Sequence, residues 1–344
     1  MKAAVYSRYG PPDVLEIKDV EKPVPKDNEV LIEVRAASVN PLDGGSMKDM
    51  PYIVRLLLGL RKPKNTRLGV DVAGQVEAVG RNVTQFKPGD EVFGACISDP
   101  QDSGVKVWVP QGAFAEYVCA PESTLVLKPD NVTFEQAASV PVAAFTALQG
   151  LRGKGQIQPG QKVLINGAAG CVGTFAVQIA KSFGAEVTGV CSTKNLDMVR
   201  SIAADHVIDY TKEDFTESGQ NYNKRYDLIF DCVGNHSLSA CGRVLTPKGI
   251  DVMVGELSGR GMIAIVARLI TALLWSRFAS RKFVPFLARP NKEDLTTMRD
   301  LMKAGKVKPV LDKRYSLSEV PEAIRYLDER HARGKVVISL EKKQ

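Results

Sequence analysis

Two apolar patterns divide the chain into regions that predict different architectures. Up to about residue 129, short apolar segments recur about every eight to twelve residues and are separated by prolines and glycines, a pattern typical of a small antiparallel β-barrel. The predicted strands of this region are 14–20, 29–38, 70–79, 90–96, 114–120 and 124–127. We therefore expect a first domain over residues 1–129.

The second pattern begins at about residue 130, where apolar strand-like runs alternate with segments of helical spacing. Such alternation predicts β-α-β units that build a doubly wound parallel sheet. We expect this second domain over residues 130–289, and we expect residues 290–344 to return to the first domain with a final strand at 335–340. The predicted strands of the sheet are 162–166, 186–191, 206–209, 227–233, 249–254 and 283–286.

One turn in the second region carries the strongest chemical signal. The strand at 162–166 breaks into small residues and continues as a helix, and the strand at 186–191 completes a β-α-β unit of about 30 residues. Small residues let the backbone approach a pyrophosphate, and the positive end of the helix dipole attracts it. Glycine spacing alone would fit any strand-to-helix turn, but the whole unit favours a Rossmann-type dinucleotide site. Its predicted turn residues are Ala169, Gly170, Cys171, Val172 and Gly173.

The residues after the second strand of this unit indicate which dinucleotide binds. A site for NAD usually places an acid there to bind the ribose hydroxyls, whereas a 2′-phosphate needs donors or a cation. This chain has Ser192, Thr193 and Lys194 at that point and no acid until Asp197, which favours NADPH. The alternative is an ordinary turn in which Ser192 or Thr193 caps the next helix.

Composition and charge fit a two-domain globular enzyme. The 344 residues exceed the usual size of a single core, and 44% apolar with 25% charged residues is ordinary. The net charge is +7, but the basic residues are scattered and their densest clusters lack the interleaved aromatics of a nucleic-acid platform. We expect no nucleic-acid partner, and we interpret the charge as solvation and attraction of an anionic cofactor.

Three further features bear on where the protein works. The chain begins directly with a strand-like segment and no leader pattern, and its six cysteines form no Cys-x-x-Cys pair, so we expect a cytoplasmic protein. The apolar segment 262–275 contains Arg268 and is shorter than the roughly 20 residues of a membrane span. We interpret it as a helix at a domain or subunit interface, with peripheral membrane contact as the alternative.

Five motifs in a fixed order resemble a known family. Besides the dinucleotide turn, they are ASVNPLD at 37–43, GVDVAG at 69–74, PGDEV at 88–92 and GKVV at 334–337. Together they are similar to the zinc-free quinone oxidoreductase branch of the medium-chain dehydrogenase/reductase superfamily, over nearly the whole chain. The resemblance implies a Rossmann domain with a GroES-like antiparallel β-barrel catalytic domain, and a homodimer joined near residues 283–286.

The positions that match the zinc ligands of related enzymes argue against a metal. Zinc-dependent alcohol dehydrogenases of the superfamily use a Cys, a His and a second Cys or an acid. The corresponding residues here are Asn40, Val70 and approximately Val142, and the four-cysteine structural-zinc loop is missing. We therefore expect no metal site and, without a Lewis acid to stabilise an alkoxide, no ordinary alcohol oxidation.

The remaining chemistry is hydride delivery to a conjugated acceptor, a quinone or an α,β-unsaturated carbonyl (an enone). The oxyanion formed there needs only hydrogen bonds and a proton. A short-chain reductase is excluded because no tyrosine is followed four residues later by lysine. Two alternatives stay open: a nucleotide-binding regulatory or structural relative with little turnover, and a zinc-independent alcohol dehydrogenase.

The resemblance also implies roles for residues on the substrate side. Asn40 and Thr146 would line the nicotinamide and substrate cleft, with Asp43 bracing the loop after Asn40. Lys48 and Tyr52 are the predicted donors to the developing oxyanion, although either could be an exposed lid residue. Some relatives carry a tyrosine nearer to the aspartate, where this chain has two glycines, so the proton donor stays open.

On the cofactor side, the resemblance adds Tyr210 as a partner of Ser192 and Lys194 at the 2′-phosphate, with a plain strand-end aromatic as the alternative. The other predicted cofactor residues are Cys232, Val233 and Gly234 near the nicotinamide ribose, Phe283 over the nicotinamide and Lys335 over the pyrophosphate. We interpret Cys232 as a packed neighbour because no adjoining His or Lys lowers its pKa. Lys335 has a surface cation as its alternative role.

Overall fold

The computed structural model describes residues 1–48, 63, 66–97, 110–217, 225–254, 270–272, 274–276, 280–329 and 332–340. The chain divides into two compact units, one of residues 1–142, 290–304 and 309–344, the other of residues 143–289 and 305–308. The first boundary lies later than the predicted residue 129, because helix α4 (Phe134–Ala138) packs on strands of the first unit. The short return of residues 305–308 to the second unit was not predicted.

The second unit is built on a six-stranded parallel sheet of order β10-β9-β8-β11-β12-β13. Its strands are β8 (Lys162–Asn166), β9 (Glu186–Cys191), β10 (His206–Asp209), β11 (Tyr226–Asp231), β12 (Leu245–Met253) and β13 (Lys282–Pro285). The strand order changes side at β8: β9 and β10 follow on one side of it, and β11, β12 and β13 lie on the other. This is the doubly wound Rossmann order, and ligands bind beyond the carboxyl ends of the strands at such a reversal.

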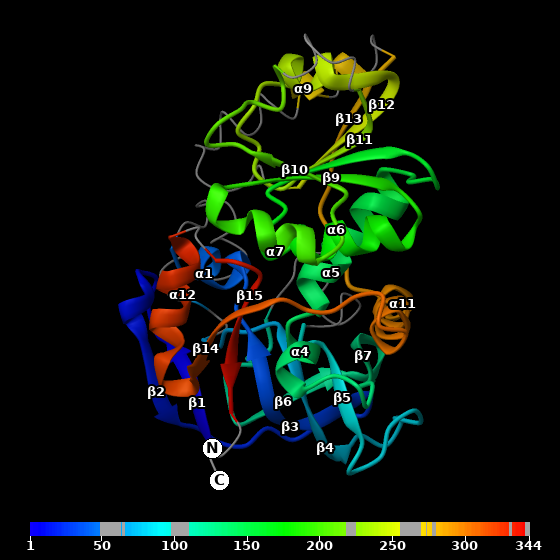
Figure 1. Cartoon of the computed structure of the whole chain (residues 1–344). Coiled ribbons are helices and arrows are strands. Elements are labelled where there is room, and N and C mark those ends of the chain that lie inside the picture. The colour runs from blue at the N-terminus through cyan, green and yellow to red at the C-terminus, as the bar shows by residue number, and fades with distance from the viewer. Residues whose placement is uncertain are drawn as a thin grey trace. The chain divides into compact units, whose positions relative to one another are not determined.

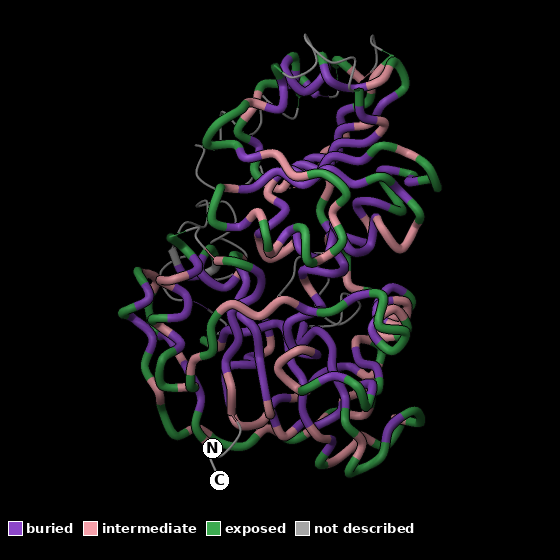
Figure 2. Tube along the Cα trace, viewed as in Figure 1, coloured by how far each residue is buried: buried purple, intermediate pink, exposed green. Residues whose placement is uncertain are grey.

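Helices cover both faces of this sheet, with α6 and α7 on one face and α9 on the other (Figure 1). The helical segments of this part of the chain are α5 (Pro141–Leu148), the π-helical turn η3 (Gln149–Lys154), α6 (Gly173–Ser182), η4 (Thr193–Asn195), α7 (Leu196–Ser201) and α9 (Leu238–Val244). Helix α6 is buried from Gly173 to Ala180, and the buried positions follow the strands of the sheet (Figure 2). The sheet and its helices therefore share one apolar core.

The first unit contains a mixed sheet of seven strands, of order β14-β15-β3-β4-β5-β7, with β6 paired to β3. Its strands are β3 (Glu29–Ser38), β4 (Asp71–Val79), β5 (Glu91–Ala95), β6 (Tyr117–Pro121), β7 (Leu125–Leu127), β14 (Leu311–Ser316) and β15 (Lys335–Ser339), beside a two-stranded sheet of β1 (Lys2–Tyr6) and β2 (Leu15–Asp19). All its pairs are antiparallel except β14 with β15. That pair is parallel because helix α12 (Val320–Asp328) crosses between the two strands. The arrangement is that of a GroES-like domain.

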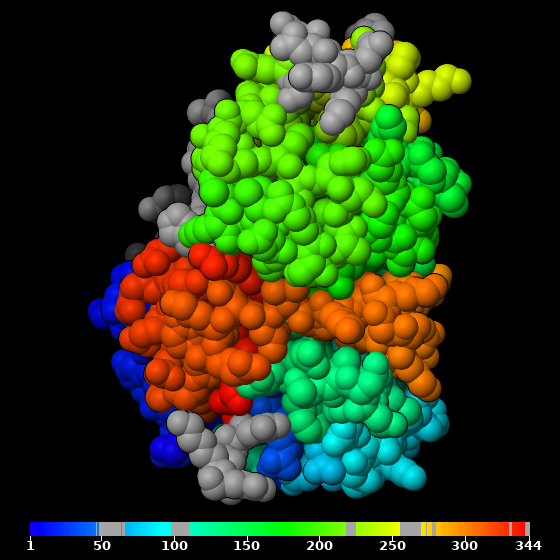
Figure 3. All heavy atoms as spheres, in the orientation of Figure 1, coloured from blue at the N-terminus to red at the C-terminus, as the bar shows by residue number. Residues whose placement is uncertain are grey.

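The C-terminal segment completes the first unit, as the sequence predicts. Strand β15 pairs with β3 in the register Val337 to Ser38, and Arg325 on α12 forms an ion pair of 2.9 Å with Asp13. The red C-terminal residues accordingly lie beside the blue N-terminal ones (Figure 3). The remaining helical segments of this unit are η1 (Pro12–Val14), α1 (Pro41–Lys48), η2 (Glu122–Thr124), α11 (Lys292–Lys303) and η5 (Leu317–Glu319).

The apolar segment 262–275 lies largely outside the described residues, which include only 270–272, 274 and 275 of it. Among them, Ile270 and Leu274 are exposed, and the Trp275 ring packs edge-on against Phe283 at 6.0 Å between centroids. No helix in the described part of the chain has the length and apolar character to cross a membrane.

Candidate active site

The dinucleotide turn of the second unit has the backbone geometry that its small residues predict. Strand β8 ends at Asn166, and Gly167 follows with a φ of +85°, which side chains disfavour. A Cβ atom on Gly173, the first residue of α6, would lie 2.1 Å from the carbonyl oxygen of Gly167. Only glycine fits there, so the helix starts directly against the turn. The Thr174 and Ala176 amides of the first helical turn donate to the Gly170 and Val172 carbonyls, so the turn continues directly into the helix. A turn of small residues at the positive end of a helix dipole fits a pyrophosphate.

Two polar residues that the sequence analysis did not single out hold the reversal point of the sheet. The Asn166 side chain donates to Asp231 Oδ1 at 2.8 Å, across the ends of the paired strands β8 and β11. The same oxygen accepts the amides of Val233 at 3.0 Å and Gly234 at 2.9 Å, and the Cys232 amide donates to the Asn166 carbonyl. The segment predicted near the nicotinamide ribose is thus fixed to the dinucleotide turn. The sequence feature that could have identified Asn166 and Asp231 is a polar residue at the end of an otherwise apolar strand.

Cys232 lies in this fixed segment as a neutral thiol. Desolvation, and next the Asp231 carboxylate, raise the pKa of the Cys232 thiol well above its ordinary value. A thiol with a raised pKa is a poor nucleophile at neutral pH. The structure therefore supports the interpretation of Cys232 as a packed neighbour, while Val233 beside it is half exposed.

The end of strand β9 presents the groups predicted for a 2′-phosphate. Lys194 is exposed, and Ser192 Oγ accepts a hydrogen bond from the Asn195 side chain at 3.2 Å, so the serine hydrogen is left to donate. The Tyr210 amide donates to the Cys191 carbonyl at 3.1 Å, which keeps the exposed Tyr210 ring at the same strand end. These residues therefore share one edge of the sheet.

Thr193 and Asp209 form a separate pair at this edge. The Thr193 hydroxyl donates to Asp209 Oδ2 at 2.5 Å, and the Thr211 hydroxyl donates to Oδ1 at 2.7 Å. The bond from Thr193, followed by those from Thr211, lowers the pKa of the Asp209 carboxyl. Asp209 is therefore ionised, and its charge is directed at hydroxyl groups and at Lys212, 3.7 Å away. Thr193 is committed to that carboxylate, which leaves Ser192 and Lys194 as the phosphate candidates.

In the first unit, Asp43 braces the turn after Asn40, as the resemblance implies. Its Oδ2 accepts the Asn40 amide at 2.8 Å and its Oδ1 accepts the Gly69 amide at 3.1 Å. Asp43 is fully buried, and burial raises the pKa of its carboxyl to about 7, with the Asp71 carboxylate adding to the rise and the two amide bonds opposing it. One carboxyl thus joins the start of helix α1 to the segment before β4.

A buried ionic network surrounds the Asn40 side chain. Lys335 Nζ donates to Asn40 Oδ1 at 2.7 Å, and Asn40 Nδ2 donates to Asp71 Oδ2 at 2.9 Å. Lys335 and Asp71 are 3.3 Å apart, and both are fully buried. Ser38 Oγ donates to the same Asp71 oxygen at 2.8 Å, and the Val142 amide donates to the other at 3.0 Å. Asp71 was missed as a site residue, although it lies in a motif that carried the resemblance.

Two predicted cofactor contacts need correction. Lys335 was predicted to close over the pyrophosphate, but its ammonium is fully buried and directed at Asn40, Asp71 and the Val39 carbonyl. Phe283 was predicted over the nicotinamide, but it is 2% exposed and packs in the core of the sheet with residues such as Leu164. The β-strand that carries each side chain turns it into a core, and a strand pattern alone does not say which face a residue takes.

The other predicted substrate-side residues are only partly described. Thr146 lies on α5 in the second unit and is half buried. Lys48 is the last residue of α1, but its side chain lies outside the described residues, as does all of Tyr52. The proton donor therefore stays a prediction.

The residues present do not fit a zinc site. Val70 is fully buried and carries no ligand atom in its side chain, and both polar atoms of the Asn40 amide bond to Lys335 and Asp71. In the described part of the chain, no cluster of three or more His, Cys, Asp or Glu side chains has the geometry to hold a metal ion. For Asn40 Oδ1 to bind a metal ion, the metal would have to displace the Lys335 ammonium that donates to it.

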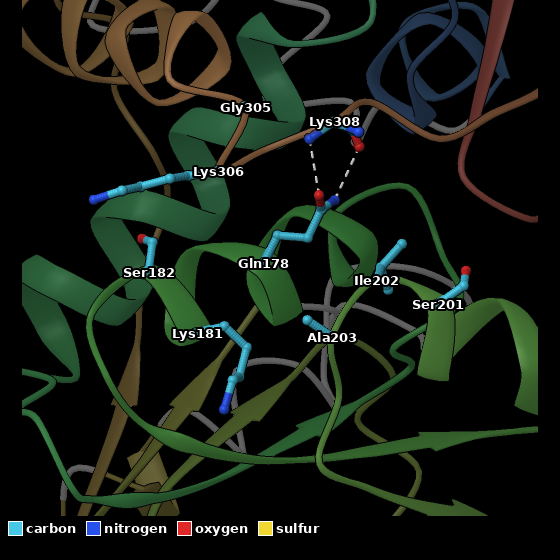
Figure 4. Close-up of a pocket in the computed structure, with 9 residues that line it drawn as sticks. All are labelled: Gln178, Lys181, Ser182, Ser201, Ile202, Ala203, Gly305, Lys306 and Lys308. Atoms are coloured by element: carbon cyan, nitrogen blue, oxygen red, sulfur yellow. Dashed lines mark hydrogen bonds between the residues drawn. The ribbon is translucent and has the colours of Figure 1, made fainter.

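A hollow of about 550 Å³ lies elsewhere in the second unit, beside α6 and residues 305–308. The Gln178 side chain binds the backbone of Lys308 there through bonds of 2.8 and 3.0 Å (Figure 4). Lys181 is paired with Asp205, and Figure 4 shows that the side chains of Lys181 and Lys306 point in different directions. None of the predicted site residues that the structure describes lines this hollow. The two hydrogen bonds between Gln178 and Lys308 explain why residues 305–308 belong to the second unit.

Comparisons with known proteins cover nearly the whole chain. Residues 26–130 match the model of the alcohol dehydrogenase GroES-like domain, and residues 202–338 match the model of the zinc-binding dehydrogenase family. An NADPH-dependent alkenal/one oxidoreductase from Arabidopsis thaliana is 35% identical over 98% of this chain and 79% of its own.

Two solved structures are similar over 99% of this chain, each with 29% identity and a TM-score of 0.82. One is a quinone oxidoreductase from Coxiella burnetii, of which 99% is covered, and the other is an NAD-dependent alcohol dehydrogenase, of which 100% is covered. The names of these relatives agree on oxidoreductase or dehydrogenase chemistry and differ on the substrate, and two of the three names include a nicotinamide cofactor.

Proposed function

The chain belongs to the medium-chain dehydrogenase/reductase superfamily, in its quinone oxidoreductase branch, and from this premise we propose that it is an NADPH-dependent reductase of quinones or enones that works without zinc. The alkenal/one and quinone specificities named for its relatives support this choice of acceptor. The observation that carries the proposal is the dinucleotide cradle whose neighbouring strand β9 is followed by Ser192 and Lys194 instead of an acid.

The second unit would hold the cofactor. The turn from Gly167 to Gly173 fits the pyrophosphate, and the Ser192 hydroxyl with the Lys194 ammonium fits a 2′-phosphate. Asp231 fixes the segment at Val233 and Gly234, which would border the nicotinamide ribose. NADPH, when bound, supplies the hydride; the protein supplies the position and the charge around it.

The first unit would bind the oxygen of the acceptor. When hydride adds to a conjugated acceptor, negative charge develops on the carbonyl oxygen, and a fixed hydrogen-bond donor there lowers the barrier. Asn40 is the donor that the first unit positions, through the Asp43 brace on its backbone and the buried network on its amide. The zinc-free chemistry is supported by the commitment of Asn40 to Lys335 and Asp71.

The test is oxidation of NADPH and of NADH by the metal-stripped protein with a panel of quinones, enones and simple alcohols. We expect turnover with quinones or enones, faster with NADPH than with NADH. Reduction of NADP by simple alcohols would instead identify a zinc-independent alcohol dehydrogenase. NADPH binding without turnover of any acceptor would identify a regulatory relative. The predicted homodimer and cytoplasmic location are tested separately, by solution mass and by cell fractionation.

A further inference from the structure

We propose that Asp71 and Lys335 are positioning residues that hold the Asn40 side-chain amide in one orientation, with its nitrogen presented as the donor to the acceptor's oxygen. The inference rests on the proposed function and deepens it, because it states how a donor is fixed at the position where related dehydrogenases hold a metal. Neither residue would contact the substrate. Both would act through Asn40.

The chemistry of the two partners determines the orientation of the amide. An ammonium can only donate hydrogen bonds and a carboxylate can only accept them. Lys335 Nζ lies 2.7 Å from one polar atom of the Asn40 amide, and Asp71 Oδ2 lies 2.9 Å from the other. The atom beside Lys335 must therefore be the oxygen, and the atom beside Asp71 must be the nitrogen. The flipped amide would set oxygen against carboxylate and N–H against ammonium.

Asp71 and Lys335 both lie on strands of one sheet. Asp71 begins β4 and is directly opposite Ser38, the last residue of β3, while Lys335 begins β15 on the other side of β3. Three adjacent strands of one sheet thus carry the network. Both charges are fully buried, so water does not screen the pair or compete for its hydrogen bonds. A site held by strands is more precise than one held by loops.

One amide hydrogen of Asn40 is left for a ligand. The first hydrogen on Nδ2 goes to Asp71. Among the described residues, the acceptor for the second is the Ser38 carbonyl, at 3.4 Å, which is beyond the usual range for an N–H to oxygen hydrogen bond. An oxyanion placed along that hydrogen would form a shorter bond, and donation from Lys335 to Asn40 Oδ1 would polarise the amide and strengthen it. The negative charge that develops on the acceptor's oxygen would then face the N–H donor of Asn40 and not its amide oxygen.

The variants must remove both charges of the pair, because a buried charge that has lost its partner strongly destabilises a protein. The double variant Lys335→Met with Asp71→Asn is neutral as a pair and keeps both side-chain lengths. Ser38→Ala is the matched control: it removes a bond of 2.8 Å to the same Asp71 oxygen but leaves both contacts to the Asn40 amide. A cooperative thermal unfolding transition checks that each variant is folded.

The first readout is steady-state kinetics with an enone and with NADPH deuterated at the transferred position. In the double variant we expect kcat to fall by about 100-fold, the size of a lost oxyanion donor, with a larger isotope effect and an NADPH Kd within about twofold of the wild type. Ser38→Ala should stay within about threefold in kcat. A double variant that loses no more kcat than Ser38→Ala overturns the proposal.

The second readout needs no turnover. With asparagine labelled with ¹⁵N, the two Asn40 amide hydrogens of the wild type and of Ser38→Ala should exchange slowly with water at distinct chemical shifts, and in the double variant they should exchange faster by at least about tenfold. Unchanged exchange in the double variant overturns the positioning role. A wild type that turns over no acceptor, yet shows this dependence, refutes the proposed function and leaves the positioning role standing.

Discussion

A Cβ atom on Gly173 would lie 2.1 Å from the carbonyl oxygen of Gly167, closer than any real contact of that kind. The start of α6 is therefore packed directly onto the dinucleotide turn. In a Gly173→Ala variant, backbone must shift at the pyrophosphate cradle, so we expect NADPH affinity to fall at least about tenfold and the melting temperature to drop. Fluorescence titration with NADPH and thermal unfolding measure the two effects.

Gly170→Ala is the control within the same turn. Its added Cβ would lie 3.4 Å from the same Gly167 oxygen, which is ordinary van der Waals contact, so the melting temperature should stay near that of the wild type. If both alanine variants were equally stable and bound NADPH equally well, the close approach at Gly173 would have no bearing on the cofactor.

The Lys194→Glu variant tests the proposed choice of NADPH. It places a carboxylate where we place the 2′-phosphate, so the Kd for NADPH should rise at least about tenfold while that for NADH changes little. Lys162→Glu changes the net charge equally, but Lys162 begins β8, at the amino-terminal ends of the parallel strands and away from the proposed site. This variant should therefore change the Kd of either cofactor little. Equal losses for NADPH and NADH in Lys194→Glu would remove Lys194 from the site.

The sheet of the second unit was predictable because its strands are nearly continuous apolar runs between helical segments. Residues 162–166, 186–191 and 206–209 were predicted with the bounds that the structure has. The start of strand β12 was predicted too late, because Thr246, Pro247 and Lys248 interrupt the apolar pattern there. The boundary after Val142 was missed because nothing in the composition of α4 says which of two sheets it covers.

The candidate site was less predictable, since its order depends on contacts between residues distant in sequence. The glycine turn is local and could be read directly. The pairing of Lys335 with Asp71 joins positions far apart in the chain, and a lysine at the start of a strand usually indicates a surface cation. Only the antiparallel pairing of β15 with β3 brings that side chain beneath Asn40.

The raised pKa of Asp43 predicts a pH dependence of stability. The folded pKa is about 7 and the ordinary value is 3.8, so between about pH 4 and pH 7 the folded protein holds a proton that the unfolded chain has lost. The contribution of Asp43 to the free energy of unfolding therefore falls as pH rises through this window and levels off above about pH 7. Urea unfolding at several pH values, compared between wild type and Asp43→Asn, measures it.

Asparagine at position 43 cannot ionise, so the free energy of unfolding of the variant should depend less on pH between pH 4 and pH 7 than that of the wild type. At every pH the variant also lacks one of the two side-chain oxygens that accept the Asn40 and Gly69 amides. The Asp205→Asn variant is a suitable control, because the pKa of the Asp205 carboxyl is lowered from 3.8 instead, so its removal should act below about pH 4 and leave the slope between pH 4 and pH 7 unchanged. Identical slopes for the wild type and Asp43→Asn would contradict a raised pKa at Asp43.

Metal removal should leave the proposed activity intact. Asn40 and Val70 stand at two of the positions that hold zinc in related enzymes, and neither offers a free ligand atom. After dialysis against a chelator, we expect no zinc by elemental analysis and an unchanged rate of NADPH oxidation with an enone or quinone. A rate that is lost on chelation and restored by added zinc would refute the zinc-free proposal.

Asp231 and Asp227 lie on the same strand, β11, and give a matched pair of variants. Asp231 Oδ1 accepts three bonds at the carboxyl end, from Asn166, Val233 and Gly234, whereas Asp227 Oδ2 accepts the Lys162 amide at the other, exposed end. Asp231→Ala leaves three donors without that acceptor, at about 1–3 kcal/mol for each one that stays buried. Asp227→Ala exposes its donor to water and should cost less than about 1 kcal/mol.

The two variants should also differ in cofactor binding, because the donors that Asp231 collects belong to both halves of the proposed site. Without it, the dinucleotide turn at Asn166 and the ribose segment at Val233 are no longer tied together, so the NADPH Kd should rise at least about tenfold in Asp231→Ala and stay within about twofold in Asp227→Ala. Urea unfolding and NADPH titration of both variants make the comparison. If Asp231→Ala lost stability but kept full affinity for NADPH, Asp231 would stabilise the sheet without shaping the cofactor site.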